Sequence, residues 1–379
     1  MRTFSTRSLL FVPAAVGLSI AVAAAPVAAV SWVKTTLTNA GGTALQDAAF
    51  QGHNAAVVWQ APGPITKIRT STNNGSSFGA THIVEPGRQT RQASTALCGS
   101  DLYVAFAQND SLPATPNLWR IYVDRDTTAG VTHEVSAADQ TQDTIGRFPD
   151  VACSATKLWV SWEQKVGGQW HVYVNWAARS AASFNSTPMD LGLLASDAGK
   201  PVIAGSGNNV YVAWSTPSGT IRIHRWNDAS GVTDLGERQL ATGNPSGGGA
   251  GVPRIDASGG KVAVTWFDCG DMRARVSNDR GATWGSTRTL FTGACGSEFG
   301  GLPNSIAISG SRVLVAFDLF ATRQTQHMVS TTNDFGSFTD HLAYAASDLL
   351  LLGFVHPSGA TKVAGAVDEG TRVRFLRQP

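Results

Sequence analysis

The 379-residue sequence is poor in charge, because Lys, Arg, Asp and Glu make up only 15% of it, against a usual share of about 25%. Lys and Arg number 29, Asp and Glu number 27, and the basic residues form no blocks. A nucleic-acid-binding protein normally carries a basic patch or stripe, so this class is not expected. Aromatic residues are plentiful, including 11 Trp, which excludes a disordered chain.

Long apolar runs are also lacking beyond the N-terminus, so no internal membrane span is expected. Near the start, Arg2 and Arg7 precede an apolar run from Leu9 to Ala25, and small residues follow. This order is typical of a secretory signal peptide over residues 1–29, with a membrane anchor as the alternative. Its removal leaves 27 residues of each sign. We therefore predict that residues 30–379 are secreted, to the extracellular space or the periplasm, as a neutral, monomeric domain.

Helical periodicity is nearly absent, and one phrase recurs instead: a short apolar strand, a Gly/Ser/Asn turn and a second strand that ends in an aromatic residue. The copies end at Trp59, Phe106, Trp162, Trp214, Trp266 and Phe317, and a degenerate seventh copy ends at Val367. A period of about 50 residues with four strand-like runs indicates a β-propeller blade. The sequence predicts an all-β propeller with seven four-stranded blades, and six blades is the alternative because the last copy is weak.

Both ends of the chain contribute to the last blade in this interpretation. Strand-like runs near Ala364–Val367 and Val373–Leu376 leave the seventh unit short of an outer strand, whereas Trp32–Thr38 precedes the first repeat without a blade of its own. We expect that N-terminal strand to complete the last blade and remove an open edge. The sequence thus predicts one closed propeller domain over residues 30–379.

The four cysteines have neither CxxC nor zinc-ligand spacing, which favours disulfides in an exported protein. By their phase in the repeat, Cys98 and Cys153 end the first strands of neighbouring blades. Cys269 and Cys295 fall at the opposite face, and we expect each pair to form a bridge. The histidines form no i,i+4 pair, so no metal site is predicted and no cofactor is expected.

A turn motif in the fifth unit carries a family resemblance. The segment SNDRGATW, Ser277–Trp284, matches S-x-D-x-G-x-T-W in full; STNNGSSF, Ser71–Phe78, matches with Asn73 for Asp; and TNDFGSF, Thr332–Phe338, is one residue short. This motif resembles the Asp box, or BNR repeat, of the sialidase (neuraminidase) superfamily. We expect it to be structural. The carboxylate would accept amide hydrogen bonds, Gly would permit a positive φ and Trp would pack under the turn. The residues concerned are Ser277, Asp279, Gly281 and Trp284, with Ser71, Asn73, Gly75 and Phe78.

Charged residues recur at two phases of the repeat that face the central pocket of a propeller. First strands begin at or near Arg91, Arg147, Lys200 and Arg254, with Asp150 close behind one of them. Carboxylates such as Glu163, Asp268 and Asp318 follow the aromatic landmarks. This distribution predicts a ring of cations for an anionic group, flanked by acid/base candidates; ordinary solvated loop ends are the alternative.

The family resemblance gives these residues expected roles. Sialidases clamp a substrate carboxylate with three arginines, which implies Arg91, Arg147 and Arg254, with Lys200, Glu163 and Asp318 as further substrate-binding residues. They use a tyrosine nucleophile polarised by Glu and an Asp as acid/base. That pattern points to Tyr344 with Glu298, and to Asp150 and Asp268. The family's Phe/Tyr-Arg-Ile-Pro motif is missing before the first blade, and GRFPD (Gly146–Asp150) and VPRID (Val252–Asp256) only approximate it in other blades.

These observations predict a secreted, sialidase-like hydrolase that acts at the non-reducing end of an acidic glycan. Two alternatives stay open, a glycan-binding propeller that has lost the chemistry and a propeller polysaccharide lyase. In each case the expected partner is a glycan or glycoconjugate.

Overall fold

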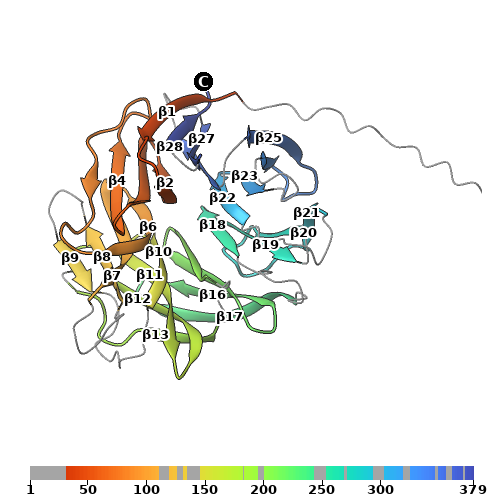
Figure 1. Cartoon of the computed structure of the whole chain (residues 1–379). Helices are drawn as coiled ribbons and strands as arrows, with labels where there is room; N and C mark the ends of the chain where they lie inside the picture. Colours follow the sequence, from red (N-terminus) through yellow and green to blue (C-terminus); the bar gives the residue numbers. More distant parts are fainter. Residues whose placement is uncertain are drawn as a thin grey trace, which may run out of the picture.

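The computed structural model describes residues 31–110, 119–125, 131–134, 146–181, 183–194, 200–242, 253–268, 271–292, 303–318, 325–345, 349–355, 361–369 and 372–379. Seven four-stranded antiparallel sheets are arranged as the blades of a ring (Figure 1). Seven blades confirm the favoured number and exclude six. Within the described residues, no helix is long and apolar enough to cross a membrane.

The strands of each blade are given in order from the axis outward. Blade 1 consists of β2 (Ala44–Gln51), β3 (Asn54–Ala61), β4 (Ile65–Ser71) and β5 (His82–Ile83). Blade 2 consists of β6 (Thr90–Cys98), β7 (Asp101–Asn109), β8 (Trp119–Arg125) and β9 (Val131–Glu134). Blade 3 consists of β10 (Gly146–Cys153), β11 (Lys157–Val166), β12 (Gln169–Ala178) and β13 (Met189–Leu193). Blade 4 consists of β14 (Val202–Ser206), β15 (Asn209–Ser215), β16 (Thr220–Asn227) and β17 (Thr233–Thr242).

The remaining three blades complete the ring. Blade 5 consists of β18 (Arg254–Ser258), β19 (Lys261–Asp268), β20 (Asp271–Ser277) and β21 (Arg288–Phe291). Blade 6 consists of β22 (Pro303–Ser309), β23 (Arg312–Asp318), β24 (Thr325–Thr331) and β25 (Thr339–Ala345). Blade 7 consists of β26 (Leu349–Val355), β27 (Lys362–Asp368), β28 (Val373–Arg377) and β1 (Val33–Thr38).

Strand β1 pairs antiparallel with β28, so the N-terminal strand forms the outer edge of the last blade, as predicted. The register joins Val33 to Arg377 and Thr36 to Arg374. This pairing ties the two ends of the ring together and leaves no open sheet at the seam.

The core consists of the layers between neighbouring blades. In β19, Val264 and Trp266 pack with residues of blade 4, whereas Ala263 and Phe267 pack with residues of blade 6. Alternate residues of a strand point to opposite faces of its sheet, so one apolar strand contributes to two such layers. The aromatic landmarks at the ends of the second strands are buried in this way, with Trp59, Phe106 and Trp162 at most 1% exposed.

The Asp box of blade 5 has the hydrogen bonds expected from its sequence. Asp279 Oδ1 accepts from the hydroxyl of Ser277 at 2.8 Å and from the amide of Thr283 at 2.8 Å. The amide of Gly281 donates to Ser277 Oγ at 2.8 Å, and Gly281 has a φ of 77°. Side-chain and backbone hydrogen bonds from Thr283, followed by that from Ser277, lower the pKa of Asp279 to about 2. The carboxylate is thus committed to its turn, which fits a structural role.

The first blade forms the same turn with an amide in place of the carboxylate. Asn73 Oδ1 accepts from the Ser71 hydroxyl and from the Ser77 amide, each at 2.9 Å, and Gly75 has a φ of 72°. A Cβ at Gly75 would lie 1.9 Å from the Phe375 ring, so glycine is required by the close approach of blade 7 as well as by φ. Phe78 packs against that same ring at 5.0 Å between centroids.

The box of blade 6 is complete, which corrects the prediction that it is one residue short. It begins at Thr331, whose hydroxyl donates to Asn333 Oδ1 at 2.9 Å, and Asn333 Oδ1 also accepts the Ser337 amide at 3.0 Å. The glycine position is held by Phe335, which keeps a positive φ of 61° and is 2% exposed. Aligning the motif glycine with Gly336 instead of Phe335 therefore moves the sequence match by one residue, although the turn has the same hydrogen bonds.

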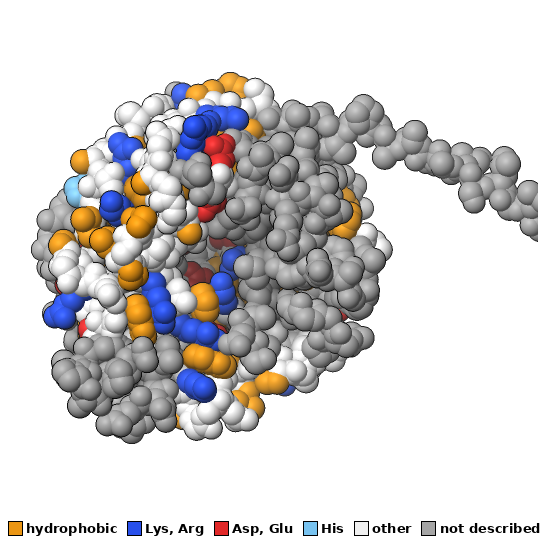
Figure 2. Space-filling model, in the orientation of Figure 1, with side chains coloured by type: hydrophobic (Ala, Val, Ile, Leu, Met, Phe, Trp, Pro, Cys, Tyr) orange, Lys and Arg blue, Asp and Glu red, His pale blue; other side chains and the backbone are white. Residues whose placement is uncertain are grey.

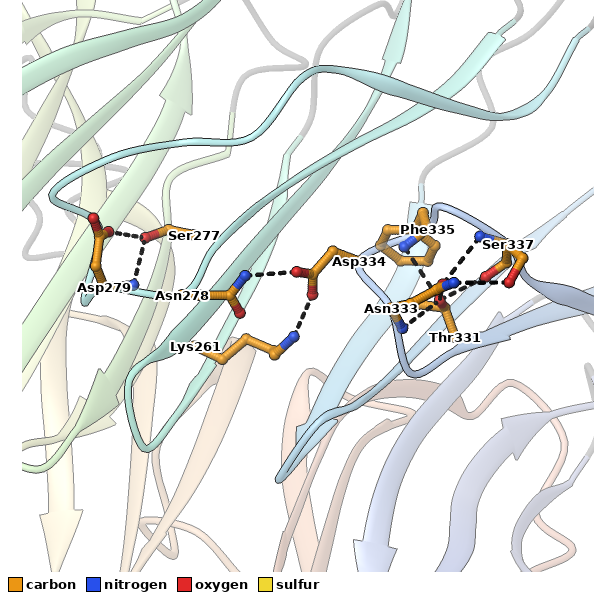
Figure 3. A network of polar contacts seen from close by, with 9 residues as sticks. All are labelled: Lys261, Ser277, Asn278, Asp279, Thr331, Asn333, Asp334, Phe335 and Ser337. Atoms are coloured by element: carbon orange, nitrogen blue, oxygen red, sulfur yellow. Dashed lines mark hydrogen bonds and ion pairs between the residues drawn. The ribbon is translucent and has the colours of Figure 1, made fainter.

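Neighbouring boxes are joined by a bridge between blades (Figure 3). Asp334 of the blade 6 box forms an ion pair with Lys261 and accepts a hydrogen bond of 2.5 Å from Asn278 Nδ2 of the blade 5 box. The amide of Arg280 donates to Gly260 O at 2.8 Å, so the box turn packs on the turn between the first two strands of its blade. The boxes therefore lie at the face where the first strands end.

Cys98 and Cys153 form a disulfide, as predicted. They are the last residues of β6 and β10, so the bridge joins the inner strands of blades 2 and 3 at the Asp-box face. The second expected bridge, Cys269 to Cys295, lies outside the described residues and stays a prediction.

Candidate functional site

A cavity of about 1170 Å³ runs through the centre of the ring and is lined by the first strands of all seven blades. It extends from Leu45 and Lys200 at the starts of first strands to Gly52 and Gly207 at their ends. Figure 2 shows Lys and Arg side chains beside the central hollow and acidic side chains within it. The cavity thus reaches both faces, with Lys200 and Arg254 toward the face where the first strands begin and Arg179 at the opposite face, where its guanidinium donates to Cys98 O.

Three aspartates lie on the first strands of alternate blades, Asp47 in blade 1, Asp150 in blade 3 and Asp256 in blade 5. Each accepts a hydrogen bond from a first-strand amide of the next blade: Asp47 from Thr95 at 2.7 Å, Asp150 from Ile203 at 2.9 Å and Asp256 from Ile308 at 2.6 Å. These bonds couple blades around the axis. Asp150, predicted as an acid/base residue, therefore also has a structural role, because it links blade 3 to blade 4.

The same aspartates have raised pKa values. Burial, followed by the charge of Asp47, raises the pKa of Asp150 to about 7 against two backbone hydrogen bonds and the charge of Arg254. Burial also raises the pKa of Asp256 to about 7 against two amide hydrogen bonds, and it raises the pKa of Asp47. A carboxyl group that titrates near neutral pH can donate and accept a proton under working conditions. Asp150 and Asp256 both line the wall of the cavity, so the cavity contains groups that can act as acid or base near neutral pH.

Arg254 lines the cavity and is electrostatically coupled to two of these aspartates. Burial lowers the pKa of its guanidinium, while the charges of Asp150 and Asp47 raise it. Its positive charge is thus balanced by carboxylates of blades 1 and 3. This arrangement differs from the expected role of Arg254 in an arginine clamp, because the charge is already compensated within the protein.

Lys200 is a second cation of the cavity wall. Its ammonium nitrogen lies 4.0 Å from the centroid of the Phe148 ring. Burial, together with the charges of Arg254 and Arg147 and against that of Glu163, lowers the pKa of Lys200 to about 8. Among the described residues, no carboxylate lies within ion-pair distance of the Lys200 ammonium. Stacking on an aromatic ring holds the charge in place without consuming its hydrogen-bond donors.

Phe148 reaches the cavity because of a bulge in β10. The register of β10 with β11 shifts between Arg147 and Asp150, and Phe148 has a φ of 48°. A bulky residue in the left-handed region costs about 1–3 kcal/mol and is concentrated at functional sites. Strand β6 has the same irregularity, with a register shift after Arg91 and a φ of 55° at Gln92. The bulges direct side chains toward the axis at the charged end.

Arg91 and Arg147 lie beside this end, outside the cavity lining, and each stacks on a tryptophan. Arg91 Cζ is 3.6 Å from the centroid of the Trp119 ring, and Arg147 Cζ is 3.7 Å from that of Trp170. Arg147 forms an ion pair with Glu163, whose side chain is 0% exposed. Burial and the charge of Arg147 lower the pKa of Arg91. Of the three expected arginines, Arg254 lines the cavity, whereas Arg91 and Arg147 do not.

Three of the four remaining predicted residues lie within the described part of the chain. Asp268, at the end of β19, pairs with Arg273 at 3.1 Å on the next strand. Asp318 ends β23. Tyr344 lies in β25, the outer strand of blade 6, and strands of a sheet are about 4.8 Å apart, so the structure does not bring its backbone to the central cavity. Glu298 lies outside the described residues.

Sequence reasoning missed the aromatic partners of the cations, Trp119, Trp170 and Phe148. Trp119 and Trp170 stand at or near the starts of third strands, directly after the loop from the second strand. That phase lies at the same face as the starts of first strands, and it could have singled them out. Within the described part of the chain, no three His, Cys, Asp or Glu side chains are grouped as a metal site would need.

Comparison with protein-family models and with curated proteins finds no match. Among solved structures, the chain is similar to Trypanosoma rangeli sialidase, with 12% identity and a TM-score of 0.46 over 89% of this chain and 60% of that one. It is also similar to a subtype N10 neuraminidase-like protein of A/little yellow-shouldered bat, with 11% identity and a TM-score of 0.46 over 76% of this chain and 94% of that one. Prolyl endopeptidase matches with 14% identity and a TM-score of 0.45 over 86% and 45%.

These likenesses concern the fold alone. The chain spans about 60% of the length of the sialidase, whose solved complexes hold the inhibitor DANA and sialic acid. The protein has a sialidase-like propeller fold, as its seven four-stranded sheets and its Asp-box turns show.

Proposed function

We propose that the protein is a secreted propeller that binds the acidic end of a glycan, of the sialic-acid type, in its central cavity. The observation that carries the proposal is the Lys200 ammonium on the Phe148 ring, a cation of the cavity wall held in place without an ion-pair partner among the described residues. A sugar carboxylate would supply the missing charge and accept the uncommitted donors.

Hydrolysis of the bound terminal sugar is the proposed reaction. Asp150 and Asp256 line the same cavity and have pKa values of about 7, so either has a proton to give to a leaving oxygen near neutral pH. The proposal does not require Tyr344, which lies on an outer strand.

Binding without turnover is the second candidate. A specific observation favours it: both carboxylate oxygens of Asp150 accept backbone amides, from Val151 at 3.0 Å and Ile203 at 2.9 Å, and those of Asp256 do likewise. The carboxylate oxygens of Asp150 and Asp256 thus already have hydrogen-bond partners within the ring, which favours a structural role over a catalytic one.

Titration calorimetry of the purified chain with N-acetylneuraminic acid and galacturonic acid tests the binding proposal. We expect at least one of them to bind wild type and Arg238→Gln alike, because Arg238 is exposed on the outer strand β17, and to bind Lys200→Met at least about tenfold more weakly. Equal affinities in all three proteins would overturn it.

Turnover is tested on sialosides and uronic-acid glycans. Released sugar would support hydrolysis. An unsaturated product, read by ultraviolet absorbance, would indicate a lyase, and binding without any product would leave the glycan-binding function.

A further inference from the structure

The charged end of the cavity continues outward as a row of stacked cations on three successive blades. Arg91 of blade 2 lies on Trp119, Arg147 of blade 3 lies on Trp170, and Lys200 at the start of blade 4 lies on Phe148. We call these three cations the cation row. Only Lys200 of the row lines the central cavity.

The members of the row repel one another. The charge of Arg147 lowers the pKa of Arg91 on one side and that of Lys200 on the other. Like charges kept within reach of each other destabilise the free protein, unless an anion is bound between them. Glu163 pairs with Arg147 from a fully buried position, so it offsets one of the three positive charges of the row.

We propose that the cation row binds successive anionic groups of one acidic polysaccharide chain, so that the ligand is a polymer of acidic sugars lying across blades 2 to 4, with one end in the cavity. This inference rests on the proposed function, since Lys200 belongs to both sites. It adds Arg91 and Arg147 as subsites for sugars further along the chain, in place of a clamp on a single carboxylate.

The aromatic rings favour a glycan over a single-stranded nucleic acid. Trp119 is only 8% exposed and has Arg91 over its ring, and Trp170 is covered by Arg147. Recognition of single strands depends on open aromatic faces on which bases stack. Here the cations occupy those faces, and what the row presents to solvent is charge and guanidinium donors, which suit carboxylates spaced along a sugar polymer.

The test is a length series, in which the mono-, tri- and pentasaccharides of galacturonic acid and of linked sialic acid are titrated into the full chain. We expect the pentasaccharide of at least one series to bind at least about tenfold more tightly than its monosaccharide. Its affinity should also fall more steeply with added salt, because more charges are paired. Monosaccharide binding with no gain over the length series would overturn the cation row and leave the proposed function intact.

Variants separate the two sites. Arg91→Met keeps Trp119 covered and removes one charge, so we expect it to weaken pentasaccharide binding by about tenfold, as for one lost charge-assisted hydrogen bond, and to leave the monosaccharide unaffected. Lys200→Met should weaken both, and Arg238→Gln neither. Equal pentasaccharide affinity of Arg91→Met and Arg238→Gln would overturn the inference.

Two further outcomes are decisive. Pentasaccharide binding without any monosaccharide binding would support the cation row and overturn the cavity as the primary site. Tighter binding of an oligothymidylate than of either pentasaccharide would overturn the assignment to a glycan.

Discussion

The ammonium of Lys200 lies 4.0 Å from the centre of the Phe148 ring, and Phe148 holds that position with a φ of 48°. A strained aromatic residue and a desolvated cation thus stabilise each other in the wall of the central cavity. Since burial lowers the pKa of Lys200 to about 8, the charge offered to a ligand depends on pH in the neutral to alkaline range.

The first prediction concerns that dependence. Affinity for an acidic monosaccharide should fall as pH rises, first near 7 as Asp150 ionises in the cavity and again near 8 as Lys200 loses its proton. In Lys200→Arg the guanidinium stays charged, so only the first fall should remain. Titrations across this pH range measure it, and two identical profiles would show that Lys200 does not carry the binding.

The second prediction concerns stability. A carboxyl group whose folded pKa is raised stabilises the fold while it is protonated, and this contribution is lost as pH rises from the unfolded value of 3.8 toward the folded value of about 7. Asp256 should therefore make the protein less stable at about pH 8 than at about pH 5, and Asp256→Asn should reduce that difference. Denaturant unfolding at both pH values measures it.

Asp279→Asn is the matched control for Asp256→Asn. The pKa of Asp279 is lowered to about 2, so its contribution is lost only as pH falls below the unfolded value and does not change between about pH 5 and about pH 8. The wild-type pH dependence should be retained in Asp279→Asn. An equal reduction of the stability difference between about pH 5 and about pH 8 in both variants would contradict the assignment of this difference to Asp256.

The third prediction follows from an exchange of side chains between blades. A Cβ at Gly281 would lie 3.1 Å from the ring of Tyr211, whereas the equivalent pair one blade further on is Phe335 and Ala263, packed in one buried cluster. In each pair one residue is aromatic and the other small. Phe335→Ala should destabilise the fold by about 3–5 kcal/mol through the cavity it leaves.

The partner substitution supplies the control. Ala263→Tyr alone should overpack the layer and cost about 1–3 kcal/mol. Phe335→Gly with Ala263→Tyr should be more stable than Ala263→Tyr alone or Phe335→Gly alone, because the double variant recreates the Gly281–Tyr211 arrangement. Additive losses in the double variant would refute the exchange.

The fourth prediction concerns the disulfide between blades 2 and 3. Cys98 and Cys153 are separated by 55 residues, and a cross-link of that kind typically stabilises by about 2–4 kcal/mol by restricting the unfolded chain. Cys98→Ala with Cys153→Ala should lower the unfolding midpoint without changing glycan affinity, since the bridge lies at the Asp-box face. A loss of affinity at full folding would mean that the bridge shapes the charged end as well.

The repeat made most of the architecture predictable. The alternation of residues in β19 and the recurrence of its Trp266 in other blades determine which residues face each neighbouring blade. The phase of Cys98 and Cys153 in the repeat was enough to pair them. Even the degenerate seventh copy kept apolar residues at Val363 and Val367, both fully buried. Period and phase are local properties, so they can be read from one sequence.

The site was less predictable because it depends on contacts between distant segments. Nothing in the residue type of Phe148 signals a positive φ, since the bulge arises from pairing with β11. The same holds for Arg254, whose compensation by Asp47 and Asp150 requires blades 1, 3 and 5 to meet across the axis. Repeat phase correctly gave the face of the ring, but it could not tell which cations are already balanced.

The last prediction decides between the two roles of Arg254. If its charge serves mainly to balance Asp47 and Asp150, Arg254→Met should leave those carboxylates uncompensated and raise the pKa of Asp150 further. The loss of stability should then be small at about pH 5. At about pH 8 it should approach the cost of breaking a buried charge pair, about 3–5 kcal/mol. Unfolding at both pH values, with NMR titration of the Asp150 carboxyl, measures it. Unchanged stability at both pH values with loss of monosaccharide binding would instead make Arg254 a ligand-binding residue, as the family resemblance implies.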